Sequence, residues 1–206
     1  MTISSIPAAP FRHLQRLTDN VGVLERADGI VPRYDHGYRV DDVARGLVVV
    51  CRQPSPSAEL ITLGRRYLYF LAQAQAADGK FRNRLGDDRR WRGKPEAQDA
   101  WGRSLWALGT AAARGPTAGI RAEARARFDV SARVGSPYPH SMAFAALGAA
   151  EVLERWQAAT AHRDRRAIAR LSRRHRVRRT PWNAGTESRL ARSRRTGHGL
   201  PRASLR

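Results

Sequence analysis

The chain has 206 residues, and its 38 lysine and arginine residues outnumber 18 aspartate and glutamate residues, giving a net charge of +20 at pH 7. This length suits one medium domain with a sizeable core, and a single cysteine excludes an internal disulfide. No apolar run approaches the ~18 residues needed to span a bilayer, and the N-terminus does not resemble a secretory signal. We therefore expect a cytoplasmic protein that does not bind membranes.

The positive charge is concentrated near the C-terminus. Residues 163–206 contain fifteen arginines against Asp164 and Glu187, a local net charge of +13. These residues also lack apolar periodicity, so we expect a disordered, arginine-rich tail. The remaining chain divides into a flexible lead (residues 1–10) and a folded domain (residues 11–162).

Two interpretations of the tail are open. A basic arm would attract the phosphates of a nucleic acid, and its binding would weaken steeply with salt. Alternatively, the tail is the product of a shifted reading frame, because GC-rich DNA read out of frame yields arginine-, alanine-, glycine- and serine-rich sequence. We favour the second interpretation, in which the folded domain is truncated.

Apolar spacing predicts helices separated by polar loops. In chain order, the expected helices are Pro10 to Leu17, Asp41 to Arg52, Ala58 to Ala77, Asp99 to Ala113, Thr117 to Val134 and Ser141 to Gln157. Between the first two, Gly22 to Arg33 predicts an extended loop or a short β-like segment. The polar stretch from Lys80 to Glu96 reads either as a functional loop, with a short β-hairpin around Gly86 to Asp88, or as a solvated loop anchored by Trp91.

These helices form a repeated unit of polar loop, apolar inner helix, turn and amphipathic outer helix. The inner helices begin near Asp41, Asp99 and Ser141, about 50 residues apart, which is in the range of a helical repeat. A third outer helix is expected to begin after Gln157. The predicted fold class is therefore all-α, built from antiparallel helical hairpins.

A dense polar cluster precedes the first inner helix. Adjacent carboxylates at Asp41 and Asp42 suit a helix N-terminus, whose free N–H groups and dipole stabilise negative charge. Capping does not explain the neighbouring base, phenol and guanidinium groups, which are His36, Tyr38, Arg39 and Arg45. The cluster is thus either a capped helix start or the rim of a binding or catalytic site.

Three segments together resemble a bacterial family of all-α toroid proteins in the six-hairpin glycosidase-like superfamily, found beside or fused to glycosyltransferases and mannoside phosphorylases. The segments are His36-Gly37-Tyr38-Arg39-Val40-Asp41-Asp42-Val43-Ala44-Arg45, Phe81-Arg82-Asn83-Arg84 and Asp99-Ala100-Trp101-Gly102-Arg103-Ser104-Leu105-Trp106-Ala107-Leu108-Gly109. The family motif usually has cysteine at position 39 and asparagine at position 43, where this chain has Arg39 and Val43.

The resemblance implies a partial (α/α) toroid in which the starts of the inner helices face one funnel that binds an oligosaccharide or glycoside. In a glycoside hydrolase or glycosyl-transferring enzyme, two carboxylates flank the bond, and our candidates are Asp42 and Asp99. The expected substrate-binding residues are His36, Tyr38, Asp41, Arg45, Arg82, Asn83, Trp91, Trp101 and Arg103. An incomplete ring would expose apolar helix faces and favour self-association.

No cofactor is expected, and the six histidines lack the spacing of a metal site. The leading hypothesis is a carbohydrate-active or carbohydrate-binding protein, inactive if the missing part of the ring is essential. The alternative is a basic helical protein that binds nucleic acid or another polyanion through residues 163–206.

Overall fold

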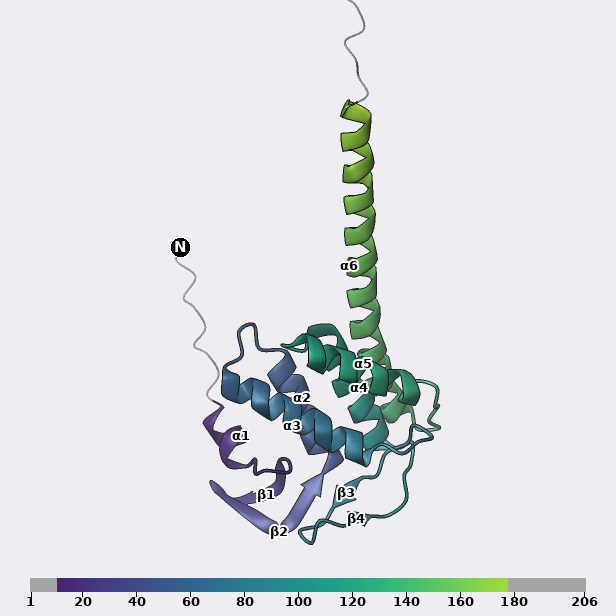
Figure 1. Cartoon of the computed structure of the whole chain (residues 1–206). Helices are drawn as coiled ribbons and strands as arrows, with labels where there is room; N and C mark the ends of the chain where they lie inside the picture. Colours follow the sequence, from purple (N-terminus) through teal and green to yellow (C-terminus); the bar gives the residue numbers. More distant parts are fainter. Residues whose placement is uncertain (1–10, 178–206) are drawn as a thin grey trace, which may run out of the picture. The chain divides into compact units, whose positions relative to one another are not determined.

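The computed structural model describes the backbone of residues 11–177 and the side chains of residues 11–161 (Figure 1). Of the described residues, 11–158 belong to one compact unit and 159–177 to a second. The described helices are α1 (Arg12–Arg16), α2 (Val40–Cys51), α3 (Ala58–Ala74), α4 (Asp99–Arg114), α5 (Ala118–Ser131) and α6 (Pro139–Val177). The described strands are β1 (Leu24–Asp28), β2 (Val31–Arg39), β3 (Arg84–Leu85) and β4 (Trp91–Arg92). The described chain is mostly helical, and none of its helices has the length and apolar character to cross a membrane.

A small antiparallel sheet, in the order β1-β2-β3-β4, corrects the all-α expectation. Its β3–β4 pair confirms the hairpin expected around Gly86 to Asp88. The β-like segment expected over Gly22 to Arg33 is also present, but β2 continues to Arg39, directly before α2. Only Gly37 and Tyr38 of β2 are buried, so the strand lacks the regular apolar alternation by which a strand is recognised in sequence.

The two faces of the sheet carry different side chains. Tyr38, Leu85 and Trp91 are register partners across β2, β3 and β4. They occupy the apolar face, where the rings of Tyr38 and Trp91 lie 6.0 and 5.4 Å from the ring of Phe70 on α3. Successive residues of a strand point to opposite faces. The opposite, polar face therefore holds Arg39, Arg84 and Arg92.

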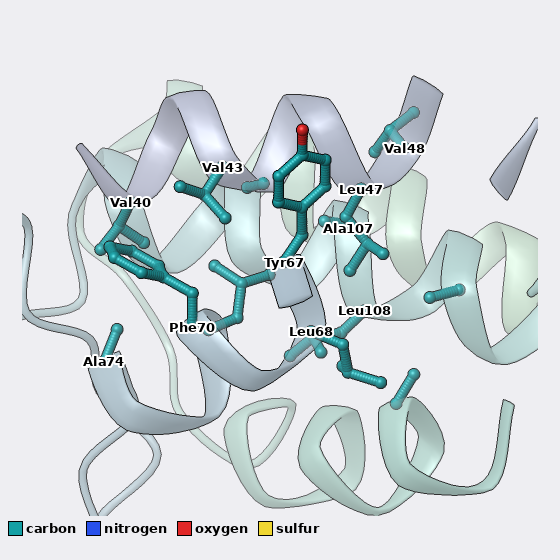
Figure 2. Packing of buried hydrophobic residues seen from close by; sticks show 14 of the residues in the cluster. Val40, Val43, Leu47, Val48, Tyr67, Leu68, Phe70, Ala74, Ala107 and Leu108 are labelled. Atoms are coloured by element: carbon teal, nitrogen blue, oxygen red, sulfur yellow. The ribbon is translucent and has the colours of Figure 1, made fainter. Parts of the chain in front are cut away.

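Two antiparallel helical hairpins, α2–α3 and α4–α5, pack through α2 and α4. Figure 2 shows the centre of this core, where Val43 and Leu47 of α2 approach Tyr67 of α3 and Leu108 of α4. Most of α2 is buried, as expected for an inner helix. Side-chain caps fix the starts of the outer helices, because Ser57 and Thr117 accept hydrogen bonds from the third residue after them, Leu60 and Ile120 respectively.

Helix α6 differs from the expected ending at Gln157. It continues without a turn to Val177, so the outer helix expected after Gln157 is wrong within the described residues. Alanine and arginine both favour helix, and no proline or glycine interrupts residues 149–177. Thus residues 163–177 of the expected disordered tail belong to α6, while residues 178–206 lie outside the described part.

Close glycine contacts show that α4 and α6 are parallel neighbours. A Cβ on Gly102 would lie 2.5 Å from the carbonyl oxygen of Ser141, and one on Gly109 would lie 2.3 Å from that of Gly148. The contacts are seven residues apart on both helices and occur in the same order, so α4 and α6 run in the same direction. The two backbones can approach closely at these positions because glycine has no side chain.

An ion-pair cluster joins the C-terminal ends of α2 and α4 to Glu151, which lies twelve residues after the start of α6. Glu151 of α6 accepts hydrogen bonds from Arg52, at 2.8 Å, and Arg114, at 2.5 Å. Arg52 directly follows α2 and Arg114 ends α4, so α2, α4 and α6 all run in parallel. Their N-termini consequently lie on the same side of the hairpin layers.

Replacing Glu151 with Gln is expected to lower the free energy of unfolding at pH 7 by about 2 kcal/mol, because two guanidinium groups lose their shared charge partner. The two arginines are half-exposed, so solvent screening holds the loss below that of a fully buried pair.

Burial raises the pKa of Glu151, but the hydrogen bonds from Arg114 and Arg52 outweigh it and lower the pKa below 4.5. The stabilisation is therefore present above pH 4.5 and disappears as the pH falls through the lowered pKa. Urea unfolding at several pH values measures the difference. Glu154→Gln is the control, because Glu154 is 71% exposed and its loss should cost about 0.5 kcal/mol. Equal stability of the two variants would contradict the role of Glu151.

Candidate functional site

The start of α2 carries a cluster of three carboxylates and three guanidinium groups, which we call the acidic–arginine cluster. Its members are Glu25, Arg39, Asp41, Asp42, Arg45 and Arg84. Nη2 of Arg45 lies 2.9 Å from Oδ2 of Asp41 and 3.0 Å from Oδ1 of Asp42. The Nε atom of Arg39 donates to Oδ1 of Asp41 at 3.0 Å. One arginine therefore joins the two adjacent carboxylates, and a second one fixes Asp41.

Glu25 and Arg84 add a third carboxylate and its partner. Nη2 of Arg84 lies 2.6 Å from Oε2 of Glu25, and Nη1 of Arg39 lies 3.9 Å from Oε1. The Glu25 side chain is 9% exposed, so it is a buried charge that depends on these partners. Arg39 links this pair to Asp41. The polar face of the sheet and the start of α2 thus form one charged network.

The pKa of Asp42 is shifted by its surroundings. Burial raises its pKa above 3.8, and the negative charge of Asp41 raises it further, while Arg45 and Arg39 act in the opposite direction. The net shift is upward, so this carboxyl group holds its proton to a higher pH than a solvated aspartate does. A carboxyl group with a raised pKa beside a second carboxylate is suited to donate a proton to a leaving group.

The start of α4 forms a second polar group. Oδ1 of Asp99 lies 2.8 Å from Nδ1 of His140, the second residue of α6, and both side chains are more than half exposed. The ring of Phe144 meets the His140 ring edge to face, with 4.9 Å between ring centroids, and its centroid lies 4.4 Å from Cζ of Arg103. Asp42 pairs with Arg45 and Asp99 with His140, so these two predicted catalytic residues share no ion-pair partner among the described side chains.

Two of the expected ligand-binding residues belong to the core instead. Trp101 is 1% exposed, and its indole N–H donates to the carbonyl oxygen of Ser131 at 3.3 Å. Tyr38 is also 1% exposed, and its hydroxyl group contacts Asp19 at 2.5 Å and Arg89 at 2.6 Å. Burial and the hydrogen bond to Asp19 raise the Tyr38 pKa. Neither side chain is exposed to solvent in this structure.

The remaining expected residues lie around the sheet. His36 is partly exposed, and its Nε2 atom lies 3.7 Å from Asp35. Arg82 is half-buried and Asn83 is exposed; the backbone of Asn83 accepts a hydrogen bond from the N–H of Val40, which fixes this loop beside the start of α2. Trp91 is half-buried on the apolar face of the sheet, opposite the acidic–arginine cluster. A ligand bound at Asp42 would not stack on Trp91.

Val43 and Arg39, the two positions at which the chain differs from the motif that it resembles, have distinct surroundings in the structure. Val43 is fully buried in the core, where the amide of an asparagine would lack water. The guanidinium group of Arg39 forms ion pairs with Asp41 and Glu25. Both residues therefore fit their present surroundings.

Sequence reasoning missed Glu25, Arg84 and His140. Each of these residues is distant in the chain from the residue with which it interacts. Strand pairing brings Glu25 and Arg84 to the site, and helix packing brings His140 to Asp99. The motif Phe81-Arg82-Asn83-Arg84 contained Arg84, which was the available signal.

No protein-family model and no curated protein matches this sequence. Within the described residues, no group of three or more histidine, cysteine, aspartate or glutamate side chains is placed to hold a metal ion.

Proposed function

We propose that this protein binds saccharides at the start of α2 and is part of an (α/α) toroid. The parallel inner helices α2, α4 and α6, with α3 and α5 outside the first two, support this architecture. In such a ring the inner helices begin at one funnel, and the acidic–arginine cluster, Asp99 and His140 are at or near the starts of α2, α4 and α6. This arrangement agrees with the resemblance to six-hairpin glycosidase-like proteins.

The single observation that carries the proposal is the shared contact of Asp41 and Asp42 with Arg45, together with the raised pKa of Asp42. Carboxylates accept hydrogen bonds from sugar hydroxyl groups, and the half-exposed Arg45 donates to them. In a glycosyl transfer or hydrolysis, Asp42 would protonate the leaving oxygen, and Asp99 is our candidate for the second carboxylate.

A ¹H–¹⁵N NMR titration with linear β-1,4-linked hexasaccharides of mannose and of glucose, followed at the amides of residues 41–45, tests the proposal. We expect wild type to bind at least one of them and Asp42→Asn to lose at least tenfold in affinity at these amides. Asp129→Asn is the matched control, because Asp129 pairs with Arg125 on α5, away from the start of α2. Equal saccharide binding by all three proteins would contradict the assignment of the site.

A second candidate function is the binding of a polyanion by the C-terminal residues, which the local charge of +13 over residues 163–206 favours. Residues 178–206 contain eight of these arginines. If the tail binds nucleic acid, their deletion should reduce both the affinity for a DNA duplex and the slope of affinity against salt. Unchanged binding after the deletion would contradict a role for this segment.

We also propose self-association of the chain through α6. Met142, Leu147 and Leu153 are 43%, 50% and 55% exposed, although α6 contacts α4 through other residues. Apolar side chains that a next helix of a ring would cover can be covered by a second copy.

Light scattering coupled to size-exclusion chromatography should therefore show concentration-dependent oligomers. Leu147→Glu combined with Leu153→Glu should restore the monomer, whereas Ala143→Glu combined with Ala146→Glu, which removes less apolar surface, should have a smaller effect. A sharp monomer peak for wild type at high concentration would contradict self-association.

A further inference from the structure

A cleft of about 410 Å³ lies between α3, the β3–β4 hairpin and the loop after α1. Six of its side chains bear on the argument: Asn20, Tyr69, Phe70, Gln73, Arg89 and Trp91. It is on the apolar side of the sheet, so β2 and β3 separate it from the acidic–arginine cluster. We propose that this outer cleft is a second saccharide-binding site, which takes an extended oligosaccharide.

Aromatic rings form one wall of the cleft. Tyr69 is 67% exposed, although its ring is large and apolar, and Trp91 is half-exposed. Trp91 is held against Phe70 with 5.4 Å between ring centroids and 56° between ring planes. Exposed aromatic faces suit the apolar C–H face of a pyranose ring, while hydroxyl groups at the ring edge need polar partners.

Polar groups surround the aromatic wall. The amides of Asn20 and Gln73 are exposed, and each supplies both a donor and an acceptor. This combination of a ring face with amide groups matches a sugar, whose ring is apolar and whose edge is polar. A purely apolar ligand would leave these amides without a role.

Arg89 is fixed at the edge of the cleft. Its guanidinium group donates to Tyr38 at 2.6 Å and to Asp19 at 3.3 Å, and it lies 5.0 Å from the centre of the Tyr38 ring. These hydrogen bonds occupy two of its five N–H donors. Among the described residues, Arg89 is the only non-glycine residue with positive φ, at 62°, and such backbone conformations are concentrated at functional sites. A fixed guanidinium group loses little conformational entropy when it donates to a ligand.

A second hollow extends the binding surface. A cavity of about 620 Å³ between α3 and α5 shares Tyr69 and Gln73 with the outer cleft, and Arg65 and Thr117 are also part of its lining. Arg65, Tyr69 and Gln73 are four residues apart and therefore form one stripe along α3. A ligand that crosses this stripe contacts both hollows. This geometry favours a linear oligosaccharide over a single sugar.

The choice of a saccharide rests on the proposed function, whereas the position of the cleft does not. The test is a ¹H–¹⁵N NMR titration of the full chain with the same β-1,4-linked hexasaccharides and with the corresponding disaccharides. We expect shifts at the amides of Gln73, Arg89 and Trp91, and at least tenfold weaker binding of the disaccharides. Tyr69→Ala should weaken binding at these amides at least tenfold, while Tyr34→Ala, which removes a tyrosine that is 58% exposed on β2, should change it less than twofold.

The Asp42→Asn variant separates the two sites. In this variant, shifts at the outer cleft should persist while those at residues 41–45 disappear. The outer cleft is not a saccharide site if its amide signals do not shift with either hexasaccharide, or if Tyr69→Ala leaves the affinity unchanged. The shifts at residues 41–45 test the site at the start of α2 independently. Shifts that are confined to the cleft would instead overturn the site at α2 and leave the outer cleft supported.

Discussion

Asp42→Asn is expected to lose saccharide binding at the start of α2 while unfolding at a higher temperature than wild type at pH 7. The fold raises the pKa of Asp42, chiefly by burial and then by the charge of Asp41, so ionisation of this side chain opposes folding. Asparagine has nearly the same shape and no charge. It therefore removes the cost of ionisation but also removes the carboxylate that the proposal assigns to the ligand.

The pH dependence fixes the sign of this effect. Below pH 3.8 Asp42 is protonated in both the folded and the unfolded chain, so wild type and Asp42→Asn should have similar stability. As the pH rises through the unfolded pKa of 3.8 towards the raised folded pKa, the unfolded chain releases its proton first and wild type loses stability. Calorimetry from pH 3 to pH 7 measures the gap.

Asp129→Asn controls for the loss of one carboxylate, and its melting temperature should change little, because the ion pair of Asp129 with Arg125 is exposed. A variant Asp42→Asn that is less stable than wild type at pH 7 would contradict the electrostatic argument. Such a result would mean that the contact with Arg45 outweighs burial and the charge of Asp41.

Gly148→Ala is expected to destabilise the protein by about 3 kcal/mol, because a methyl group does not fit between α4 and α6. The added Cβ would lie 2.2 Å from the carbonyl oxygen of Leu105 and 3.0 Å from the Cα of Trp106. Both are backbone atoms, so the contact is relieved only if the helices move apart. Urea unfolding of the full chain measures the loss.

Gly119→Ala is the matched control for this substitution. Gly119 is in α5, and a Cβ at this position would meet no atom within 4 Å. Alanine favours helix over glycine, so this variant should be more stable than wild type by up to about 1 kcal/mol. If both variants gained stability, the close packing of α4 against α6 would be wrong.

The sequence predicted most helices well because their apolar positions recur with helical spacing. The expected helix from Asp99 to Ala113 and the observed α4, Asp99–Arg114, agree within one residue. The end of α6 was not predicted: from the sequence we expect the inner helix to end at Gln157 and residues 163–206 to be disordered, whereas arginine and alanine continue the helix to Val177.

For the candidate site, the sequence identified Asp41, Asp42 and Arg45, which are within one helical turn and meet without help from the rest of the fold. It did not identify Glu25, which reaches the cluster only through the pairing of β1 with β2. It also could not distinguish Trp91 from Trp101. Both follow polar stretches, but packing buries Trp101 against Ser131 and leaves Trp91 beside a cleft.

By itself, the sequence determined the helical hairpins, the concentration of charge at the C-terminus and the paired carboxylates at the start of α2. These features depend on local spacing and composition, which short-range contacts express directly. Only the tertiary structure decided that α2, α4 and α6 are parallel, that the sheet separates Trp91 from Asp42, and that Tyr38 and Trp101 belong to the core. Such outcomes depend on contacts between residues far apart in the chain, and the local pattern around each residue does not specify its distant neighbours.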